Sequence, residues 1–149
     1  MRLYKLTDQA GQTYGKTQWG EGITHTTSGE GDLCGPGFLH AYTDPILASL
    51  LNPIHAAIPA PLLWEAEGEI VKTDHGLKVG TARLTTLWQI PLPVISIEQR
   101  VRFSIACAWP RAPQAWRAWA VDWLSGSNQS EAAAGAAAWA AAEAAGAAW

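Results

Sequence analysis

The feature that most constrains the fold is an alternating segment, residues 62–72, with the sequence LLWEAEGEIVK. Trp64, alanine, glycine and isoleucine occupy its even positions from 64 to 70, and glutamates occupy positions 65, 67 and 69. Successive side chains of a strand point to opposite faces, so this alternation predicts a strand with one buried and one acidic face. The turn residues TDHG at 73–76 predict a hairpin to a second strand over residues 77–93, which ends at the prolines at 91 and 93.

The rest of the chain combines strands with helices. Residues 2–8, 13–19, 22–27 and 38–43 are rich in threonine, aromatic and apolar side chains and predict strands. Asp44 followed by Pro45 is typical of a helix start and predicts a helix over residues 45–57, interrupted near Pro53. Ser96 and Gln99 form a capping-box pattern before a helix that ends near residue 109. The prediction is an α+β fold: an N-terminal antiparallel or mixed sheet with one inserted helix, followed by C-terminal helices.

The C-terminal third differs in composition from the rest, because six of the nine tryptophans follow residue 100. Residues 113–124 predict a helix whose stripe of Trp116, Trp119 and Trp123 is interpreted as a packing face, with a ligand-stacking platform as the alternative. Beyond Ser130 the chain is mostly alanine, which favours a further helix. We therefore expect one α+β domain over residues 1–126 and a helical tail over 127–149. The tail is expected to form a homo-oligomer through the C-terminal helices or to dock on the tryptophan stripe, rather than to be free in solvent.

Charge and cysteine content exclude several classes of protein. A formal net charge of −3 disfavours binding of extended nucleic acid. The alanine-rich segment is weakly apolar and carries Glu131 and Glu143, which disfavours a membrane span. Cys34 and Cys107 fit neither a disulfide framework nor a zinc-ligand spacing, so no metal is expected. The first residues lack a signal-peptide pattern, and the predicted location is cytoplasmic.

Residues 28–45, SGEGDLCGPGFLHAYTDP, form the candidate binding loop. Such loops on a rigid scaffold often carry sites. Glycines permit positive φ and close approach of a ligand to main-chain N–H groups, which is how anions are often bound. The candidate ligand-binding residues of this loop are Gly29, Gly31, Gly35, Gly37, His40 and Tyr42.

Candidate catalytic residues lie on the strands around this loop. His25 and one of the three glutamates, Glu65, Glu67 or Glu69, are predicted to form an acid–base or ribose-binding cluster near Tyr42. The alternatives are a solvated glutamate face, a structural role for His25 and a core role for His40. Cys34 is a weaker candidate for a nucleophile, and Cys34 with His25 and His40 for a zinc site. His55 and His75, at a helix end and a turn, are expected to be exposed.

Three segments carry a resemblance to known proteins. GDLCGPGFLHAYTDPILASLLNP, LWEAEGEI and HGLKVGTARLTTLWQIPLP, before an end rich in alanine and tryptophan, resemble an uncharacterised family of small bacterial and phage-encoded proteins. At a looser level, the order of elements is similar to ADP-ribosyltransferase-like folds. That resemblance implies an NAD cleft in which Tyr42 and one of Glu65, Glu67 or Glu69 serve as two of the site residues, while the first site residue of those enzymes has no clear match.

Two functions follow as expectations. The first is binding of an NAD- or ADP-ribose-like nucleotide, by a sequestering protein in phage counter-defence or by an ADP-ribosyltransferase-like enzyme, with no other cofactor. The alternative is a self-assembling protein that uses the tryptophan stripe and the alanine-rich helix. The sequence leaves open whether any ligand is turned over.

Overall fold

The computed structural model describes residues 1–130, and the predicted tail from residue 131 onward lies outside the described residues. The chain divides into two compact units, Met1–Val94 and a second that begins at Ile95. This division falls earlier than the boundary after residue 126 that the sequence suggested. Antiparallel strands and helices are both present, so the predicted α+β class is confirmed.

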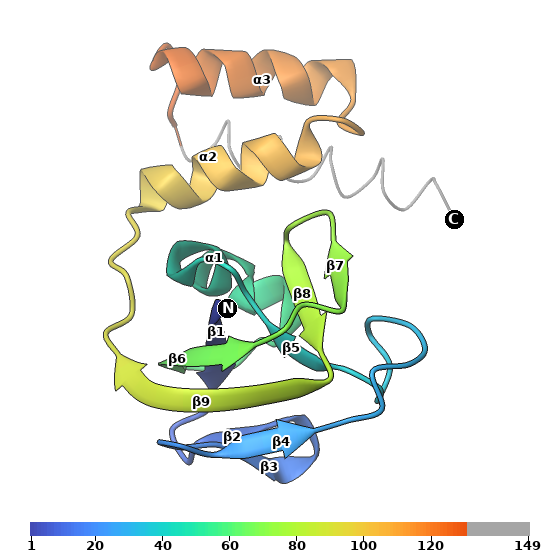
Figure 1. Cartoon of the computed structure of the whole chain (residues 1–149). Coiled ribbons are helices and arrows are strands. Elements are labelled where there is room, and N and C mark those ends of the chain that lie inside the picture. The colour runs from blue at the N-terminus through green and yellow to red at the C-terminus, as the bar shows by residue number, and fades with distance from the viewer. Residues whose placement is uncertain (131–149) are drawn as a thin grey trace. The chain divides into compact units, whose positions relative to one another are not determined.

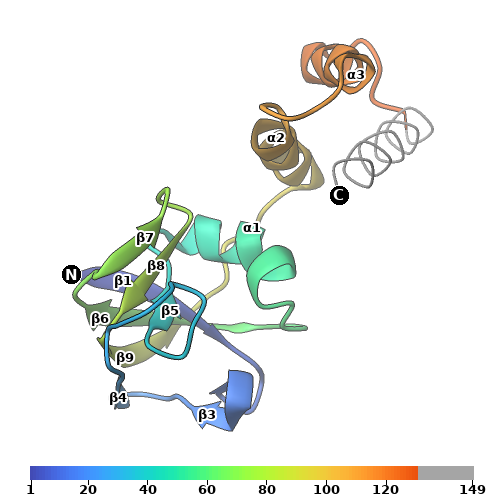
Figure 2. The ribbon, with the colours of Figure 1, turned by 90° about the vertical axis from the view of Figure 1, so that its right-hand side faces the viewer.

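The first unit contains two main antiparallel sheets (Figures 1 and 2). In one sheet the strand order is β1-β6-β9-β4, with β1 at Arg2–Thr7, β6 at Leu62–Gly68, β9 at Arg83–Ile90 and β4 at Thr24–Thr26. In the other the order is β5-β8-β7, with β5 at Leu39–Ala41, β8 at Lys78–Thr81 and β7 at Lys72–Asp74. A short ribbon of β2 (Gln12–Thr13) and β3 (Thr17–Gln18) surrounds the 3-10 turn η1 (Tyr14–Lys16).

The two main sheets are joined at two places. Tyr4 of β1 and Tyr42, just after β5, form an antiparallel bridge with N···O distances of 2.8 and 2.9 Å. At the second place, β8 runs into β9 with only Ala82 between them. One bent strand therefore contributes to both sheets, where the sequence predicted one regular strand over residues 77–93.

The alternating segment is also divided. Leu62–Gly68 forms β6, whereas Lys72 begins β7 in the other sheet, so Glu69 lies beyond the end of the strand that holds Glu65 and Glu67. Gly68 marks the break: a Cβ at this position would lie 2.7 Å from the carbonyl oxygen of Arg83. The absence of a side chain thus permits the close approach at which the two sheets diverge.

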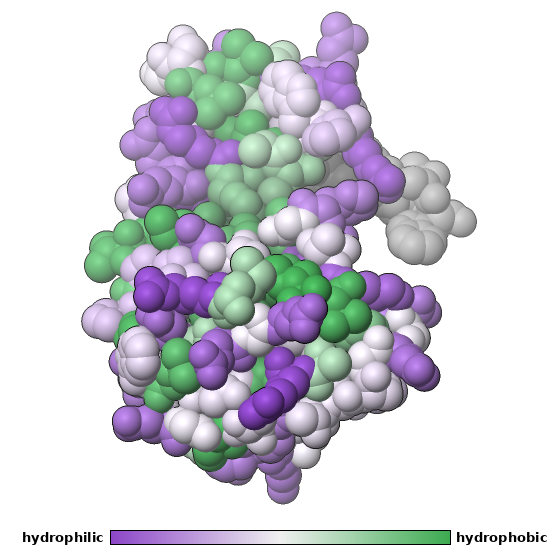
Figure 3. All heavy atoms as spheres, viewed as in Figure 1, coloured by the Kyte–Doolittle hydropathy of each residue, from purple (hydrophilic) through white to green (hydrophobic). Residues whose placement is uncertain are grey.

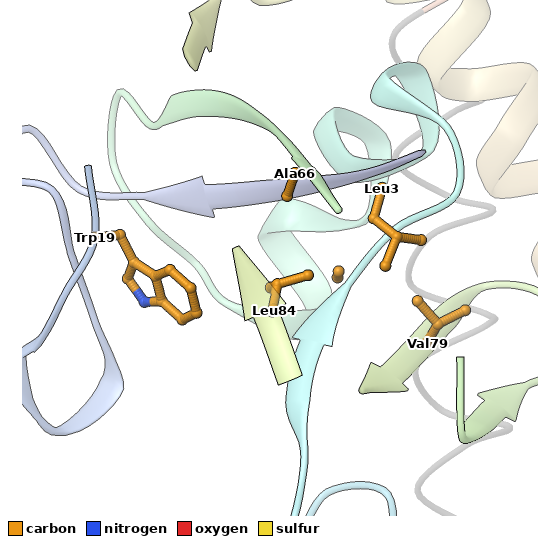
Figure 4. Packing of buried hydrophobic residues seen from close by; sticks show 6 residues of the cluster. Leu3, Trp19, Ala66, Val79 and Leu84 are labelled. Carbon is orange, nitrogen blue, oxygen red and sulfur yellow. The ribbon is translucent and has the colours of Figure 1, made fainter. Parts of the chain in front are cut away.

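Apolar side chains from both sheets pack together with Trp19, which follows β3 (Figure 4). Fully or almost fully buried members of this core are Leu3, Trp19, Ala41, Ala66, Val79 and Leu84. The strand members alternate with residues of the opposite face. That face is also partly buried, since Leu6, Leu63 and Tyr42 on it are at most 5% exposed. The indole N–H of Trp19 donates to the Thr13 hydroxyl at 2.9 Å, so its polar atom is satisfied inside the core.

The inserted helix, α1 (Pro45–His55), begins as the sequence predicted. The Asp44 carboxylate accepts from the backbone N–H of Ile46 and of Leu47 at 2.7 and 3.2 Å, and Pro45 occupies the first helical position. Ala48 and Leu51 are buried, and the helix contacts β1. The predicted span to residue 57 is two residues too long, since Ala56 is the C-cap.

The second unit contains α2 (Ile97–Ala108) and α3 (Gln114–Ser125). Ser96 and Gln99 form the predicted capping box, and Gly126 ends α3 in the left-handed conformation. Trp116 and Trp123 pack with Ile105 and Ala120, which confirms the packing interpretation of the stripe. Of the helices within residues 1–130, none combines the length and hydropathy needed to cross a membrane.

Truncating Leu84 should test the core of the first unit. Leu84→Ala removes a fully buried side chain, and we expect the free energy of unfolding to fall by about 3 kcal/mol in urea denaturation. Val94→Ala is the control, because Val94 is 98% exposed and its truncation should change stability by less than about 0.5 kcal/mol. Equal effects of the two substitutions would contradict the packing described here.

Candidate functional site

A row of polar side chains lies on the face of β1, β6 and β5 that is turned away from Leu3 and Ala41, named here the outer face, although Tyr42 on it is only 5% exposed. Glu65 pairs with Tyr4 in the β1–β6 register, and Tyr4 pairs with Tyr42 across the bridge between the sheets. Directly paired residues of antiparallel strands have side chains on the same face. The core side of these strands is occupied by Leu3, Ala41 and their neighbours. Glu65 and Tyr42 therefore share the outer face, two strands and roughly 10 Å apart.

The Lys78 side chain lies on the same face. In the β5–β8 register His40 pairs with Gly80 and Ala41 with Val79, so His40 and Lys78 face outward while Ala41 and Val79 face the core. Lys78 is nevertheless only 9% exposed. Its ammonium group donates to the Cys34 sulfur at 3.2 Å, which joins β8 to the glycine-rich loop.

The loop covers this face and is held by His40. The Nε2 atom of His40 donates to the carbonyl oxygen of Leu33, one residue before Cys34. Gly80 provides room for the cover, because a Cβ there would lie 2.6 Å from Leu33 Cδ1 and 3.0 Å from the Phe38 ring. Burial lowers the pKa of His40, and the nearby positive charges of Lys78 and Lys5 lower it further, against the opposing effect of the Leu33 hydrogen bond.

Tyr42 and His55 connect the site to the end of α1. The Tyr42 hydroxyl lies 3.3 Å from Nδ1 of His55, and the two rings are stacked with centroids 6.1 Å apart. Burial raises the pKa of Tyr42 to about 12, so its hydroxyl remains protonated at neutral pH. The pKa of His55 is lowered by burial and by the charge of Lys78, with Asp74 acting in the opposite direction. His55 is half-buried and bonded to Tyr42, so the expectation that it is exposed was wrong.

Lys5 forms a further hydrogen bond between β1 and β5, next to the Tyr4–Tyr42 bridge. Its ammonium group donates to the carbonyl oxygen of His40 at 2.8 Å and lies 4.9 Å from the centroid of the Trp19 ring. This position removes the ammonium group from water, and the desolvation lowers the pKa of Lys5 to about 8.

Within residues 1–130 the two lysines near this face have no carboxylate partner, whereas the charge of Asp74 raises the pKa of His55. Lys5, His40, His55 and Lys78 are named here the cationic cluster. The charges of Lys5 and Lys78 lower the pKa of His40, and that of Lys78 lowers the pKa of His55; Lys5 acts from the core face, where it contacts Trp19. The ion pairs within residues 1–130 are Arg2–Glu65 and Arg102–Glu98, so neither lysine of the cluster has a carboxylate within 4.0 Å in that part of the chain. Buried charges are usually paired, and the cluster is therefore chemically suited to hold an anion.

The amide groups of the loop are less available than the sequence suggested. The N–H of Gly29 donates to the Gly37 carbonyl oxygen at 2.9 Å, and that of Gly35 to the Asp32 carbonyl oxygen at 2.8 Å. Gly29 and Gly31 do have the positive φ values that their type permits, +71° and +90°. A Cβ on Gly37 would lie 1.9 Å from the Glu30 carbonyl oxygen, so this glycine serves the closure of the loop.

His25 is separated from the glutamates. It pairs with Leu84, a core residue, and its ring lies edge-on to Trp19 with centroids 4.6 Å apart. Its Nε2 donates to the Gln18 carbonyl oxygen at 2.7 Å. Glu67 pairs with Thr85, the neighbour of Leu84, and so faces the opposite side of the sheet. The structure does not bring His25 together with the predicted acidic residues.

The three glutamates have different surroundings. Glu65 forms an ion pair with Arg2 at 2.9 Å, and its side chain is 13% exposed. Glu67 and Glu69 are exposed, and Glu69 follows the end of β6. Of the three glutamates, Glu65 is therefore the best candidate for a site residue, because it is largely buried and lies next to Tyr4 on the face of Tyr42.

Sequence reasoning missed Lys5, Lys78 and the role of His55. The signal for Lys78 was present: it follows the TDHG turn and precedes Val79 at the position where alternation points it away from the core. The zinc alternative is not assembled, since within residues 1–130 no three His, Cys, Asp or Glu side chains are close enough to hold a metal ion.

One hollow of the first unit lies apart from this cluster. It has a volume of about 280 Å³ and a largely apolar lining. The lining residues are Gln9, Ala60, Pro61, Leu62, Leu63, Gln89, Ile90, Pro91 and Leu92. None of them belongs to the cationic cluster, so the hollow and the cluster are separate features.

Compared with protein-family models, with curated proteins and with solved structures, the chain gives no match. The resemblance to small bacterial and phage-encoded proteins and to ADP-ribosyltransferase-like folds therefore stays a prediction.

The lowered pKa of Lys5 predicts a pH dependence of stability. Between about pH 8 and pH 10 the unfolded chain keeps the Lys5 proton while the folded state loses it, so the free energy of unfolding rises with pH. The gain is on the order of 2–3 kcal/mol at most. Tyr42 acts in the opposite direction, but only above about pH 10, where the unfolded tyrosine begins to ionise.

Urea denaturation at pH 7, 8, 9 and 10 would measure this effect. Wild type should gain stability relative to Lys5→Met across the series, because methionine has no proton to lose. Lys16→Met changes an exposed lysine and should keep the wild-type slope. Parallel slopes for wild type and Lys5→Met would show that Lys5 is not desolvated in the folded state.

Proposed function

We propose that the first unit binds a small phosphorylated ligand of the NAD or ADP-ribose type on the outer face that carries Tyr42, Lys78 and Glu65. The observation that supports this most is the cationic cluster with its two lysines that lack a carboxylate partner within residues 1–130. A phosphate or diphosphate would supply the missing negative charge, and charge-assisted hydrogen bonds are the stronger kind.

The neighbours of the cluster suit the rest of such a ligand. Glu65 is paired with Arg2 through Oε1, which leaves Oε2 to accept from a ribose hydroxyl. Tyr42 is only 5% exposed and its hydroxyl is bonded to His55, so it supports the site from beneath. The half-buried ring of His55, which is stacked on Tyr42, adds an aromatic edge. The ligand would thus span from the cluster toward β6, with the loop over residues 28–38 at its phosphate end.

Binding is the proposed activity, ahead of transfer. A transferase of this kind needs a carboxylate with both oxygens available to the ribose, and one oxygen of Glu65 is held by Arg2 at 2.9 Å. The loop amides of Gly29 and Gly35, which a cradle for a diphosphate would use, are engaged within the loop. A protein that sequesters a nucleotide, as the resemblance to phage proteins implies, requires neither group to be free.

Calorimetric titration with ADP-ribose, NAD and inorganic pyrophosphate would test the proposal. Lys78→Gln should weaken binding tenfold or more, since a hydrogen bond to a charged group contributes about 1.5–3 kcal/mol. Lys16→Gln makes the same substitution at an exposed position and should bind like wild type. The absence of heat and of a melting shift with every ligand at millimolar concentration would refute the proposal.

A second candidate function is self-assembly through the second unit. Its tryptophan core leaves other apolar side chains exposed: Val121 by 53% and Leu124 by 36% on α3, and Ile97 by 81% on α2. Figure 3 shows hydrophobic atoms at the surface over α3. Val121 and Leu124 are three residues apart and lie on one side of α3, where a second copy of the chain can cover them.

Sedimentation of a charged variant would test assembly. Val121→Glu combined with Leu124→Glu should shift the protein toward monomer, because two carboxylates in an apolar contact are desolvated without a partner. Gln114→Glu adds a negative charge at an exposed position of the same helix and should leave the mass unchanged. A wild-type protein that is already monomeric at high micromolar concentration would contradict this function.

A further inference from the structure

Cys34 and Lys78 bring a thiol and an amine into direct contact. The Lys78 nitrogen lies 3.2 Å from the Cys34 sulfur, although the two residues are 44 positions apart in the sequence. Cys34 is exposed, whereas Lys78 is only 9% exposed. A small oxidant can therefore reach the sulfur from solvent, and the buried Lys78 amine contacts the same sulfur from the protein interior.

The loop holds this contact from both sides of Cys34. His40 Nε2 bonds the Leu33 carbonyl oxygen, and the Gly35 N–H donates to the Asp32 carbonyl oxygen at 2.8 Å. Lys72 fixes a third point, since its ammonium group donates to the Gly31 carbonyl oxygen. A thiol held beside an amine by several independent hydrogen bonds meets the positioning requirement of an intramolecular reaction.

We propose that Cys34 and Lys78 form a covalent sulfur–nitrogen bond when the protein meets hydrogen peroxide, as a reversible modification of the loop. In the first step the Cys34 sulfur attacks one peroxide oxygen: an S–O bond forms, the O–O bond breaks, and the released hydroxide takes the thiol proton to give water. Sulfur is oxidised by two electrons and peroxide is reduced.

In the second step the Lys78 nitrogen, after passing one proton to solvent, attacks the sulfenic sulfur. The S–N bond forms, the S–O bond breaks, and the hydroxide leaves as a second water with a proton from the ammonium. The product has lost two hydrogen atoms relative to the thiol and amine. Two equivalents of an added thiol reverse it, since attack on sulfur displaces the amine and the resulting disulfide is then reduced.

Cys107 provides an internal control. It is also exposed, but it lies on α2 in the second unit, and no hydrogen bond joins it to a lysine within residues 1–130. The same peroxide treatment should convert Cys107 to oxygen adducts without a link to an amine. The link at Cys34 does not depend on whether the first unit binds a nucleotide.

Peptide mapping by mass spectrometry of the full-length protein, treated with hydrogen peroxide and digested without reductant, would test the inference. We expect a Cys34–Lys78 cross-linked peptide that has lost two hydrogen atoms, and its loss after dithiothreitol. Lys78→Arg keeps a positive charge but removes the amine, so its Cys34 should proceed to sulfinic acid instead. Cys34→Ser should give no link.

Three outcomes would overturn the inference: an unmodified Cys34, oxygen adducts on Cys34 without a link, or an equal yield of the link in protein unfolded in urea before treatment. A link to Lys72 in place of Lys78 would count against it as well, since Lys72 contacts the same loop. If the link forms in a protein that binds no nucleotide, the inference stands and only the proposed function fails.

Discussion

The two hydrogen bonds between Tyr4 and Tyr42 are the interaction on which the rest of the first unit depends. They join the edge of one sheet to the edge of the other and fix which side of β5 faces the core. Because side chains alternate along a strand, a slip of one residue at this bridge would turn His40 inward and Ala41 outward. The burial of Ala41 and Val79 in the shared core opposes that slip. The outward direction of His40 and Lys78 thus follows from apolar packing on the opposite face.

Two lysines near this bridge, Lys5 and Lys78, lower the stability of the folded state. Each ammonium group is largely removed from water and has a neutral partner, a carbonyl oxygen for Lys5 and a sulfur for Lys78. Neutral partners compensate only part of the desolvation of a charge. Such an arrangement is retained at sites more often than in plain cores. The same reasoning connects the proposed anion and the proposed sulfur–nitrogen bond, since each would satisfy the Lys78 nitrogen in a different way.

Local signals in the sequence predicted the α+β class, the start of α1, the capping box of α2 and the packing role of Trp116 and Trp123. The start of α1 and the capping box depend on neighbours within about three residues, and the tryptophan stripe depends on the repeat along one helix. The failures come from contacts between distant segments. Alternation predicted the strand at Glu65 but not its break at Gly68, which follows from the approach of Arg83. Pairing of Tyr4 with Tyr42 brings Glu65 to the face of Tyr42, and nothing near Glu65 in the sequence indicates it. His25 was wrongly grouped with the glutamates. Its side of the sheet is set by its pairing with Leu84, which is distant in the sequence.

The single residue between β8 and β9 also bears on how the first unit opens. Lys78–Thr81 is hydrogen-bonded to β5 and β7, and Arg83–Ile90 to β6 and β4, with only Ala82 between these two sets of partners. With only one residue between β8 and β9, one sheet cannot open without disturbing the hydrogen bonds of the other. The slow-exchanging amide protons of both sheets should then belong to one cooperative unit, and a modification at the Lys78 end would be felt as far away as β4.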